Sequence, residues 1–373
     1  MIDNLYIAAF TLLQIAFWVQ LYYTTVINSH LSKFKITDDT EGQLNRQVSV
    51  IICARNEEKN LEANLRFILE QNYPAFEVVV VNDCSVDDSH MILRGFSSLY
   101  PNLRVVTIDE HERFKHGKKF AVTLGIKAAK YEYLLFTDAD CKPASDKWIE
   151  KMQKHFSERK EIILGFSPYL KMPGFLNKLI RYETFFTALN YISFTLAGRP
   201  YMGVGRNMGY TKSLFFKGKG FASHMHIPSG DDDLFVNQNA NSSNVAIELH
   251  PDSHIWSHPK TTFSSYVRQK LRHMGAGTAY KPEHKRMLSL QTGSAIVFYL
   301  SLIVLIIIKA QWWMLASFYL LRLCVQVFVF YPVLKKLNYK DLIWWIPVLD
   351  LSFNFYILVL SIISLFKKKV KWK

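Results

Sequence analysis

Long apolar segments without charge stand at both ends of this sequence, and few folds can accommodate them. Residues 5–27 contain no charged side chain, and a helix of that length measures about 34 Å, enough to cross the hydrocarbon core of a bilayer. Asp3 precedes the segment, which ends at Tyr22 and Tyr23 instead of at small residues. We therefore expect a retained membrane anchor rather than a cleaved signal peptide, with a buried helix of a soluble core as the alternative.

Further apolar segments follow in the last quarter of the chain, at residues 292–308, 312–334 and 342–366. Tryptophans lie at their ends, where aromatic side chains of membrane proteins gather at the lipid–water boundary. These tryptophans are Trp312, Trp313, Trp344 and Trp345. The sequence thus predicts one anchor, a polar middle region and a C-terminal membrane cluster.

Basic residues beside the spans indicate the orientation, because cytoplasmic flanks carry an excess of Lys and Arg. The residues that follow the first span include Lys33, Lys35 and Arg46. We expect an integral protein of the plasma (inner) membrane with its middle region in the cytoplasm. The lysines of residues 367–373 conflict with a simple last crossing, and Pro347 and Asp350 interrupt the last segment. A crossing, an interfacial course and a re-entrant course therefore stay open for it.

Composition excludes several classes of protein. The chain has 373 residues, half of them apolar, and a formal net charge of +14, so intrinsic disorder is excluded. The four cysteines lack the CxxC spacing of zinc sites and are too few for a disulfide scaffold. We assign the basic excess to residues that face anionic lipid headgroups. We expect no nucleic-acid partner, because the sequence contains no recognition-helix, RNP or zinc-finger pattern.

The middle region alternates short apolar runs with amphipathic segments. The runs predict strands buried on both faces, at residues 48–53, 77–82, 103–108 and 133–137. The segments between them predict helices, at residues 60–71, 88–98 and 118–130. Strands that alternate with helices predict a parallel sheet with right-handed crossovers. The expected fold class is therefore α/β, with membrane helices at both ends of the chain.

Polar residues follow three of the predicted strands, at the sheet edge where such folds bind ligands. The first group is Arg55, Asn56 and Glu57, the second is Asp83, and the third is Asp138 and Asp140. A single acid after a strand is usually a turn or a helix cap. Several acids on one edge repel each other unless a cation or hydrogen-bond donors offset their charge. The sequence therefore predicts a binding site at this edge.

Asp138 and Asp140 can share one pocket if the chain stays extended after the strand. Their hard oxygen ligands suit Mg²⁺ or Mn²⁺ shared with a diphosphate, whose charge such an ion neutralises. Asp83 suits a hydrogen bond from a nucleotide base N–H, such as the uracil imide, because Asp87 and Asp88 are better placed to cap the next helix. A helix cap for Asp83 and an ordinary surface loop for the DxD pair are the alternatives.

Lys118 stands at the start of a predicted helix, in the sequence His116-Gly117-Lys118-Lys119. A lysine and backbone amides at a helix start can bind phosphate, and an ordinary solvated basic turn explains the pattern equally well. Residues 203–209 are dense in glycine, which permits close approach of the backbone to a ligand. This segment does not match a dinucleotide-binding fingerprint.

Two more segments carry candidate side chains. Asp231, Asp232 and Asp233 precede a predicted helix; one of these carboxylates can act as general base toward an acceptor hydroxyl, or the group can be an acidic first turn that interacts with the helix dipole. A predicted helix at 263–276 brings to one face Gln269, Arg272 and His273. An arginine there can bind a diphosphate through two hydrogen bonds, or the face is simply solvated.

In this order the motifs resemble those of glycosyltransferase family 2, the inverting nucleotide-sugar transferases with a GT-A fold. The resemblance extends over residues 48–273. It rests on VSVIICARNEE, Asp83, the DxD motif of Asp138 and Asp140, GVGRNMGY, GDDDL, and Gln269 with Arg272 in the family's (Q/R)xxRW motif. The membrane segments look like those of the branch that includes ceramide glucosyltransferases and hyaluronan or cellulose synthases.

The resemblance implies roles for the matching residues. Asp83 contacts the base, Asp140 coordinates Mg²⁺ or Mn²⁺, and Asp138 lies near the ribose or the metal. Asp232 is the general base, while Gln269 and Arg272 bind the donor diphosphate or the acceptor. We group with the donor site Arg55, Asn56, Glu57, Lys118 and His273.

Two positions depart from the family pattern. His273 stands where Trp is usual, which argues against acceptor stacking and hence against processive polymer synthesis. The base motif reads Asp231-Asp232 where Glu-Asp is common, so Asp231 is an alternative base.

We therefore expect an inverting, metal-dependent transfer of a sugar from a UDP-linked nucleotide sugar to a hydroxyl of a lipid or lipid-linked acceptor at the cytoplasmic membrane face. The alternatives are a processive polysaccharide synthase, a nucleotidyltransferase and a non-catalytic membrane scaffold. The aromatic and basic stretch at 164–196 lies either at the membrane surface, where it can guide a lipid, or in a domain core. The expected parts are an anchor at 1–27, a linker at 28–46, a nucleotide-sugar-binding half at 47–165, an acceptor-binding half with interfacial helices at 166–290, and a membrane cluster with a basic tail at 291–373.

Overall fold

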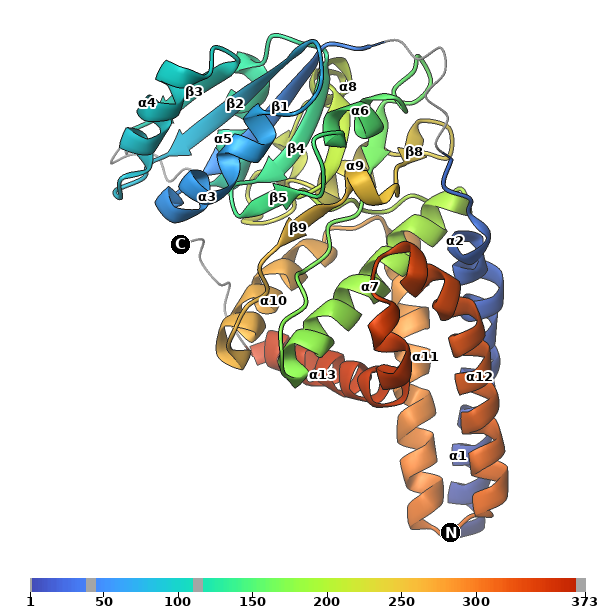
Figure 1. The fold of residues 1–373 in the computed structure, drawn as a ribbon. Coiled ribbons are helices and arrows are strands. Elements are labelled where there is room, and N and C mark those ends of the chain that lie inside the picture. The colour runs from blue at the N-terminus through green and yellow to red at the C-terminus, as the bar shows by residue number, and fades with distance from the viewer. Residues whose placement is uncertain (1, 38–44, 110–116, 367–373) are drawn as a thin grey trace. The chain divides into compact units, whose positions relative to one another are not determined.

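The computed structural model describes residues 2–37, 45–109 and 117–366. The predictions for His116 and for the lysine-rich tail lie outside these described residues. The described residues fall into two compact units, a helical one and an α/β one (Figure 1). The helical unit lies within Met1–Phe34, Pro173–Ala197 and Tyr280–Lys368, and the α/β unit within Lys35–Met172 and Gly198–Ala279.

A seven-stranded sheet forms the centre of the α/β unit, with the strand order β3-β2-β1-β4-β7-β6-β8. Its parallel half consists of β1 (Val48–Ala54), β2 (Phe76–Asp83), β3 (Leu103–Ile108) and β4 (Tyr133–Asp138). The other half consists of β6 (Ile162–Leu164), β7 (Met208–Thr211) and β8 (Val245–Ile247), with β7 antiparallel to β4 and β6. A separate two-stranded sheet pairs β5 (Cys141–Pro143) with β9 (Ile255–Ser257). The predicted α/β fold class is confirmed.

Both faces of the parallel strands are apolar, and helices cover each face. Val80 belongs to a buried cluster with Leu61 of α3, whereas its neighbour Val81 packs in another cluster with Ala121 of α5, as expected for side chains that alternate along a strand. The helices of this unit are α3 (Glu58–Leu69), α4 (Ser89–Leu99), α5 (Lys118–Ala128), α6 (Trp148–Gln153), α8 (Lys212–Lys217), α9 (Asp233–Asn239), α10 (Phe263–Gly277), and the short turns η2 (Ala222–His224) and η3 (Pro251–Ser253). α3 begins two residues before its predicted start, because the Asp87 carboxylate accepts a hydrogen bond from the Glu58 N–H at 3.1 Å.

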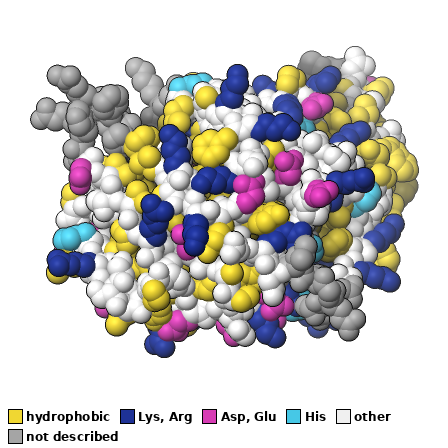
Figure 2. Space-filling model, turned by 90° about the horizontal axis from the view of Figure 1, so that it is seen from above, with side chains coloured by type: hydrophobic (Ala, Val, Ile, Leu, Met, Phe, Trp, Pro, Cys, Tyr) yellow, Lys and Arg dark blue, Asp and Glu magenta, His cyan; other side chains and the backbone are white. Residues whose placement is uncertain are grey.

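Basic side chains are spread over the face of the molecule seen in Figure 2, where they alternate with hydrophobic and acidic ones. They do not merge into one continuous basic patch among the described residues of that face. The positive charge of the chain is therefore dispersed on this side.

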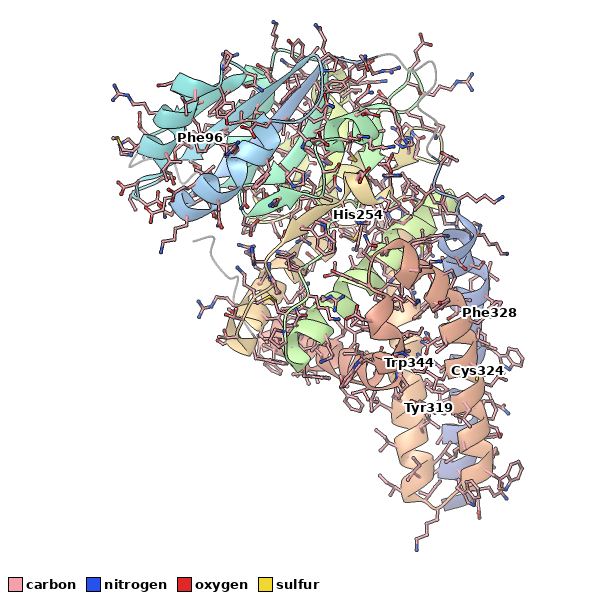
Figure 3. The ribbon with its side chains drawn as sticks, in the orientation of Figure 1. Phe96, His254, Tyr319, Cys324, Phe328 and Trp344 are labelled. Atoms are coloured by element: carbon pink, nitrogen blue, oxygen red, sulfur yellow. The ribbon has the colours of Figure 1, made fainter. Side chains whose placement is uncertain are left out.

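Four helices of the described chain are long and apolar enough to cross a membrane, and they match the predicted apolar segments. The first candidate span (Asp3–Lys33) joins α1 (Ile2–Tyr22), the π-helical turn η1 (Tyr23–Asn28) and α2 (Ser29–Lys33). The others contain α11 (Pro282–Ile307), α12 (Trp312–Lys336), and η4 (Lys340–Trp345) with α13 (Ile346–Phe366). α1, α11 and α12 run side by side (Figure 1). Phe328 projects from α12 (Figure 3) and is 82% exposed, as expected for a side chain that faces lipid.

α7 (Phe175–Leu196) belongs to the helical unit. Tyr182 and Phe185 are fully buried, since their rings contact Phe353 and Phe330 at centroid distances of 5.8 and 5.3 Å. These two side chains therefore pack in a core, and the place of the aromatic stretch at the membrane surface stays a prediction. The sequence grouped residues 166–290 together, whereas the structure groups residues 173–197 with the candidate membrane spans.

A buried ion pair joins helices of this unit. Arg322 Nη1 on α12 lies 2.8 Å from Asp350 Oδ2 on α13, and their side chains are 3% and 4% exposed. The Tyr182 hydroxyl donates to Asp350 Oδ1 at 3.1 Å and the Tyr299 hydroxyl to Oδ2 at 2.5 Å. Charges within apolar spans are costly unless they are paired, so this network ties together helices that are distant in sequence.

The last predicted segment changes character at Pro347 and not at Asp350. The 3-10 helix η4 ends at Trp345 and α13 begins at Ile346, so Pro347 is the second residue of α13, where a missing N–H breaks no helical hydrogen bond. The expectation that Asp350 interrupts the segment is wrong, because α13 runs through it and its carboxylate is paired with Arg322.

Candidate active site

The ends of β1, β2 and β4 carry the predicted polar groups to one edge of the sheet. Cys53 of β1 pairs with Val81 on one side and with Asp138 on the other, and Asp83 ends β2. Neighbouring strands lie about 4.8 Å apart and a strand rises about 3.3 Å per residue. Because Asp83 lies two residues beyond Val81, the backbones of Asp83 and Asp138 stand roughly 12 Å apart across β1. A ligand of nucleotide size can therefore contact both side chains.

Lys118, at the start of α5, lies between two carboxylates. Its Nζ is 3.0 Å from Asp138 Oδ1 and 3.0 Å from Asp231 Oδ2. Burial lowers the pKa of Lys118, but the charges of Asp138, Asp231 and Asp232 outweigh burial and raise the pKa well above its ordinary value. Burial likewise raises the pKa of Asp138, and Lys118 more than reverses this, so that the net pKa is lowered. The lysine thus joins acids from two distant segments of the chain.

Asp232 accepts hydrogen bonds from the backbone instead of from Lys118. The Gly205 N–H donates to its Oδ2 and the Asp233 N–H to its Oδ1, each at 2.7 Å. A Cβ at position 205 would lie 3.2 Å from the Asp232 carboxylate, which explains why glycine suits this close approach. Burial and the charge of Asp231 raise the pKa of Asp232. The two adjacent acids therefore have different surroundings, one ion-paired and one held by amides.

The chain does not stay extended after β4, so the assumption behind the shared DxD pocket is wrong. Residues 139–140 form a turn, and Asp140 Oδ1 accepts a hydrogen bond from the Cys141 thiol at 3.4 Å. Asp140 is nevertheless close enough to affect Glu57, whose pKa is raised by burial and by the charges of Asp140 and Asp138. Asp138 pairs with Lys118, so the two acids have different partners on the two sides of the turn.

Asp83 is 2% exposed at the end of β2, and its neighbour Asn82 is 3% exposed. One oxygen of each side chain, Asp83 Oδ1 and Asn82 Oδ1, has no hydrogen-bond partner among the described residues. Buried acceptors without a partner are rare and costly. This place therefore suits a ligand that donates hydrogen bonds.

The loop after β1 is tied to the loop after β2. Asn56 has a φ of +56°, its N–H donates to Ser85 Oγ at 3.0 Å, and its Oδ1 accepts from the Val86 N–H at 2.9 Å. Asn56 thus fixes the loop in which Arg55 and Glu57, both half-buried, stand.

The last predicted group lies on α10. Gln269 and Arg272 are half-buried and His273 is exposed. Ser229 Oγ donates to the Arg272 carbonyl at 3.2 Å, which connects α10 to the loop that leads to the acids at 231–233. The charge of Arg272 contributes to the lowered pKa of Asp138, after the larger effect of Lys118. Arg272 is therefore electrostatically part of the site.

Arg206 is a site residue that the sequence did not single out. Its guanidinium stacks on the Tyr169 ring at 4.3 Å, and its Nη2 donates to the Ser167 carbonyl at 3.3 Å. Its Nη1 is buried without a hydrogen-bond partner in the described parts of the chain, and its charge also helps to lower the pKa of Asp138. The only hint in the sequence is its place inside the glycine-dense segment.

A small pocket of about 20 Å³ joins Lys118, Asp138, Asp231 and Asp232. Two further hydroxyl groups line it, those of Thr137 and Tyr210. Both are buried, and neither has a hydrogen-bond partner among the residues described. A space of this size holds about one water molecule, so the pocket is the inner end of the site. Its lining does not include Asp83, Asp140, Gln269 and His273.

Two family descriptions match this chain. Residues 49–217 match Glycosyl transferase family 2, and residues 155–360 match Glycosyl transferase family group 2. The second match covers more than half of the chain, and the two together include every site residue described above.

Curated relatives match a shorter part of the sequence. Glycosyltransferase AglE of Haloferax volcanii is 32% identical over 140 residues, which are 37% of this chain and 44% of AglE. The 4,4'-diaponeurosporenoate glycosyltransferase of Staphylococcus haemolyticus is 31% identical over 130 residues, 35% of this chain and 34% of that protein. The chain thus spans less than half the length of these relatives.

A solved structure shares the fold over nearly the whole chain. The mannosyltransferase PcManGT from Pyrobaculum calidifontis, in complex with GDP-Man and Mn²⁺, aligns with 95% of this chain and 99% of its own, with a TM-score of 0.61 and 17% identity. At that identity the likeness concerns the fold alone. The two family matches, of which the second covers more than half of the chain, show that the chain belongs to glycosyltransferase family 2, whose members transfer a sugar from a nucleotide-sugar donor.

Proposed function

We propose that this protein transfers a sugar, with inversion and with a divalent metal, from a UDP-linked donor to a hydroxyl of a lipid or lipid-linked acceptor. The observation that carries the proposal is the cluster of Lys118, Asp138 and Asp231, with Asp232 beside it, in a chain that also holds four candidate membrane spans. Residues 47–165 bind the donor in this proposal, and residues 166–290 contribute to the acceptor side.

Donor binding uses groups that have spare hydrogen-bonding capacity. The buried oxygens of Asp83 and Asn82 suit the N–H of a base such as the uracil imide. Arg206, whose Nη1 lacks a partner among the described residues, and Arg272 are placed near the acids and suit the diphosphate, because arginine binds such oxygens through two hydrogen bonds.

The side chains at the DxD turn fit Mg²⁺ or Mn²⁺. Asp138 and Asp140 supply hard oxygen ligands, and both lie near enough to Glu57 to help raise its pKa, after the larger effect of burial. No three His, Cys, Asp or Glu side chains of the described residues gather into a complete metal site, and Mg²⁺ typically binds through one or two carboxylates plus substrate phosphates. When bound, the ion neutralises charge on the leaving diphosphate.

Asp232 is the proposed general base. Its raised pKa, caused by burial and by Asp231, brings it closer to the range in which a base is effective at neutral pH. Asp232 takes the proton of the acceptor hydroxyl, the hydroxyl oxygen attacks the anomeric carbon, and the bond from that carbon to the diphosphate breaks. Arg272 and Arg206 hold the leaving group, and a single displacement of this kind inverts the anomeric configuration. Asp231 is the second candidate.

The candidate spans support an acceptor that resides in the membrane. Lys33, Lys35 and Arg46 beside the first span favour a cytoplasmic α/β unit in the plasma (inner) membrane. The branch of the family, single transfer or processive synthesis, follows from the size of the product.

A donor screen tests this function. Membranes that contain the full chain are incubated with nucleotide sugars, and the released nucleoside diphosphate and the extractable lipid products are measured against membranes with Asp232→Asn. We expect nucleoside diphosphate release with one sugar added to an extractable lipid. Release of pyrophosphate would instead indicate a nucleotidyltransferase, a long polymer would indicate a processive synthase, and no turnover with any donor would refute the proposal.

A further inference from the structure

A second polar site lies inside the helical unit, among the candidate membrane spans. It is a cavity of about 20 Å³. Its lining combines polar side chains, among them Gln20, Asn28, Gln291, Asp350 and Asn354, with phenylalanines of α7, α12 and α13. A small polar cavity among apolar side chains suits one polar group of an amphiphile, whose hydrocarbon part stays outside the cavity.

Asn28 is the side chain of this cavity that most needs a partner. It is 2% exposed, and its Oδ1 has no hydrogen-bond partner among the described residues. It ends the π-helical turn η1, which also gives Tyr23 and Thr24 to the lining. π-Helical turns are rare and occur frequently at functional sites. A buried acceptor that lacks a donor is costly, so the cavity calls for a ligand that donates a hydrogen bond.

Charge and size limit the ligand to an uncharged group. Asp350 is the one charged side chain of the cavity lining, and its carboxylate already accepts hydrogen bonds from Arg322, Tyr182 and Tyr299. A phosphate would therefore meet a carboxylate without gaining an unpaired cation. The volume admits about one water-sized group, which is the size of a single hydroxyl.

The depth of Asn28 in the span agrees with a lipid hydroxyl. Lys336 Nζ donates to the carbonyls of Leu31 and Ser32 at 2.8 and 2.6 Å, so the ends of α2 and α12 lie together. Lysines at the ends of spans, such as Lys33 at the end of α2, extend toward lipid headgroups. Asn28 stands one to two turns before Lys33, about 7 Å along the helix axis, which is where headgroups meet the acyl chains.

We propose that this cavity binds the hydroxyl group of an uncharged lipid and excludes lipids that carry a phosphate in its place. The site is separate from the acids of the α/β unit and does not depend on the proposed sugar transfer. The lipid can be the acceptor itself or a constituent of the bilayer, since both present the same hydroxyl.

Photo-crosslinking of the full chain in nanodiscs tests the proposal. The probe is a photoactivatable diacylglycerol, which has one free hydroxyl, and the matched probe is a phosphatidic acid with the same chains. We expect the diacylglycerol to label peptides that line the cavity, competition by unlabelled diacylglycerol, and no competition by phosphatidic acid. Asn28→Leu should lower this labelling about fivefold, as for one lost hydrogen bond. Thr24→Val, at a second lining position, should lower it as well.

Thr25→Val is the matched control, because Thr25 neighbours these residues but is exposed on the same helix. Labelling by both probes alike, or labelling that Asn28→Leu and Thr24→Val leave unchanged in a folded protein, would overturn the proposal. Absence of cavity labels while lipid-facing peptides are labelled would mean that the cavity holds water only, which also overturns the proposal.

Addition of the nucleotide sugar then identifies the source of the lipid. Conversion of the bound diacylglycerol to a glycolipid marks the acceptor, and recovery of unchanged diacylglycerol marks a bilayer lipid. Both results support the site, and its failure leaves the proposed transfer untouched.

Discussion

The α/β unit and the helical unit each contain an acid paired with a cation, and the surroundings of the two pairs differ. Lys118 keeps 19% of its side chain exposed and its partner Asp138 keeps 29%. Arg322 and Asp350 are only 3% and 4% exposed, and two tyrosine hydroxyls complete the coordination of that carboxylate. The same chemistry thus occurs once in a partly open site and once in a closed one.

The difference shows where partners can be exchanged. Around Lys118 the hydroxyls of Thr137 and Tyr210 and the Nη1 of Arg206 lack partners within the described chain, so an arriving ligand can replace existing contacts and gain new ones. Arg322 also donates to Gln20, Gln326 and Tyr299, and only its Nε is buried without a partner among the described residues, so most of its hydrogen-bonding capacity is already used. The open pair suits binding and catalysis, and the closed pair suits helix packing.

The largest expected effect concerns the open site. Asp232→Asn should lower turnover about 100- to 10,000-fold, because the proton acceptor is lost, while donor binding persists. Nucleoside diphosphate release and calorimetric titration of the donor measure the two quantities. Asp233→Asn is the matched control, since Asp233 Oδ1 accepts from the Leu234 N–H and has no proposed chemical role. Unchanged turnover in Asp232→Asn would move the base to Asp231.

Substitutions in the closed pair of Arg322 and Asp350 should change the stability of the protein and not the chemical step of sugar transfer. Arg322→Met leaves Asp350 buried without its cation and should cost about 3–5 kcal/mol, measured by unfolding of the detergent-solubilised protein. The double variant Arg322→Met/Asp350→Leu should recover most of this loss, because no buried charge remains. If the single variant is as stable as wild type, the distinction between the two pairs fails.

The effects of metal should concern nucleotide binding in the α/β unit and not the stability of the protein. Asp140→Asn should weaken Mn²⁺-supported nucleotide binding at least about tenfold, measured by titration with and without Mn²⁺, and leave unfolding unchanged. Asp146→Asn is a suitable control, since Asp146 follows closely in sequence and is exposed. Equal metal-supported affinity in both variants would remove Asp140 from the metal site.

The smallest expected effect is a shift in pH dependence. The base form of Asp232 exists only above its pKa, which burial and then Asp231 raise, so activity should fall as the pH drops through that raised value. Asp231→Asn removes one cause of the rise and should move the acidic limb of kcat/KM to lower pH by less than about one unit. A limb that moves upward, or a limb that Asp232→Asn leaves in place, would contradict this assignment.

Local sequence pattern determined the elements of this fold. Runs such as VSVIIC and EVVVVN predict buried strands, segments of some twenty uncharged residues suit a membrane span, and parallel strands place the residues after their ends on one edge. The strand positions, the candidate spans and the location of Asp83 and Asp138 at one edge therefore followed from the sequence. Family motifs added the acids at 231–233 and the α10 residues.

Only the tertiary structure decided which groups meet. Lys118 lies 113 positions before Asp231 in the numbering, and Gln20 reaches Arg322 across a separation of 302. α7 packs in one unit with the candidate membrane spans. The turn at 139–140 and the orientation of Arg206 were equally hidden. Such contacts depend on packing between distant segments, where burial and charge pairing choose among many arrangements that the local pattern allows equally well.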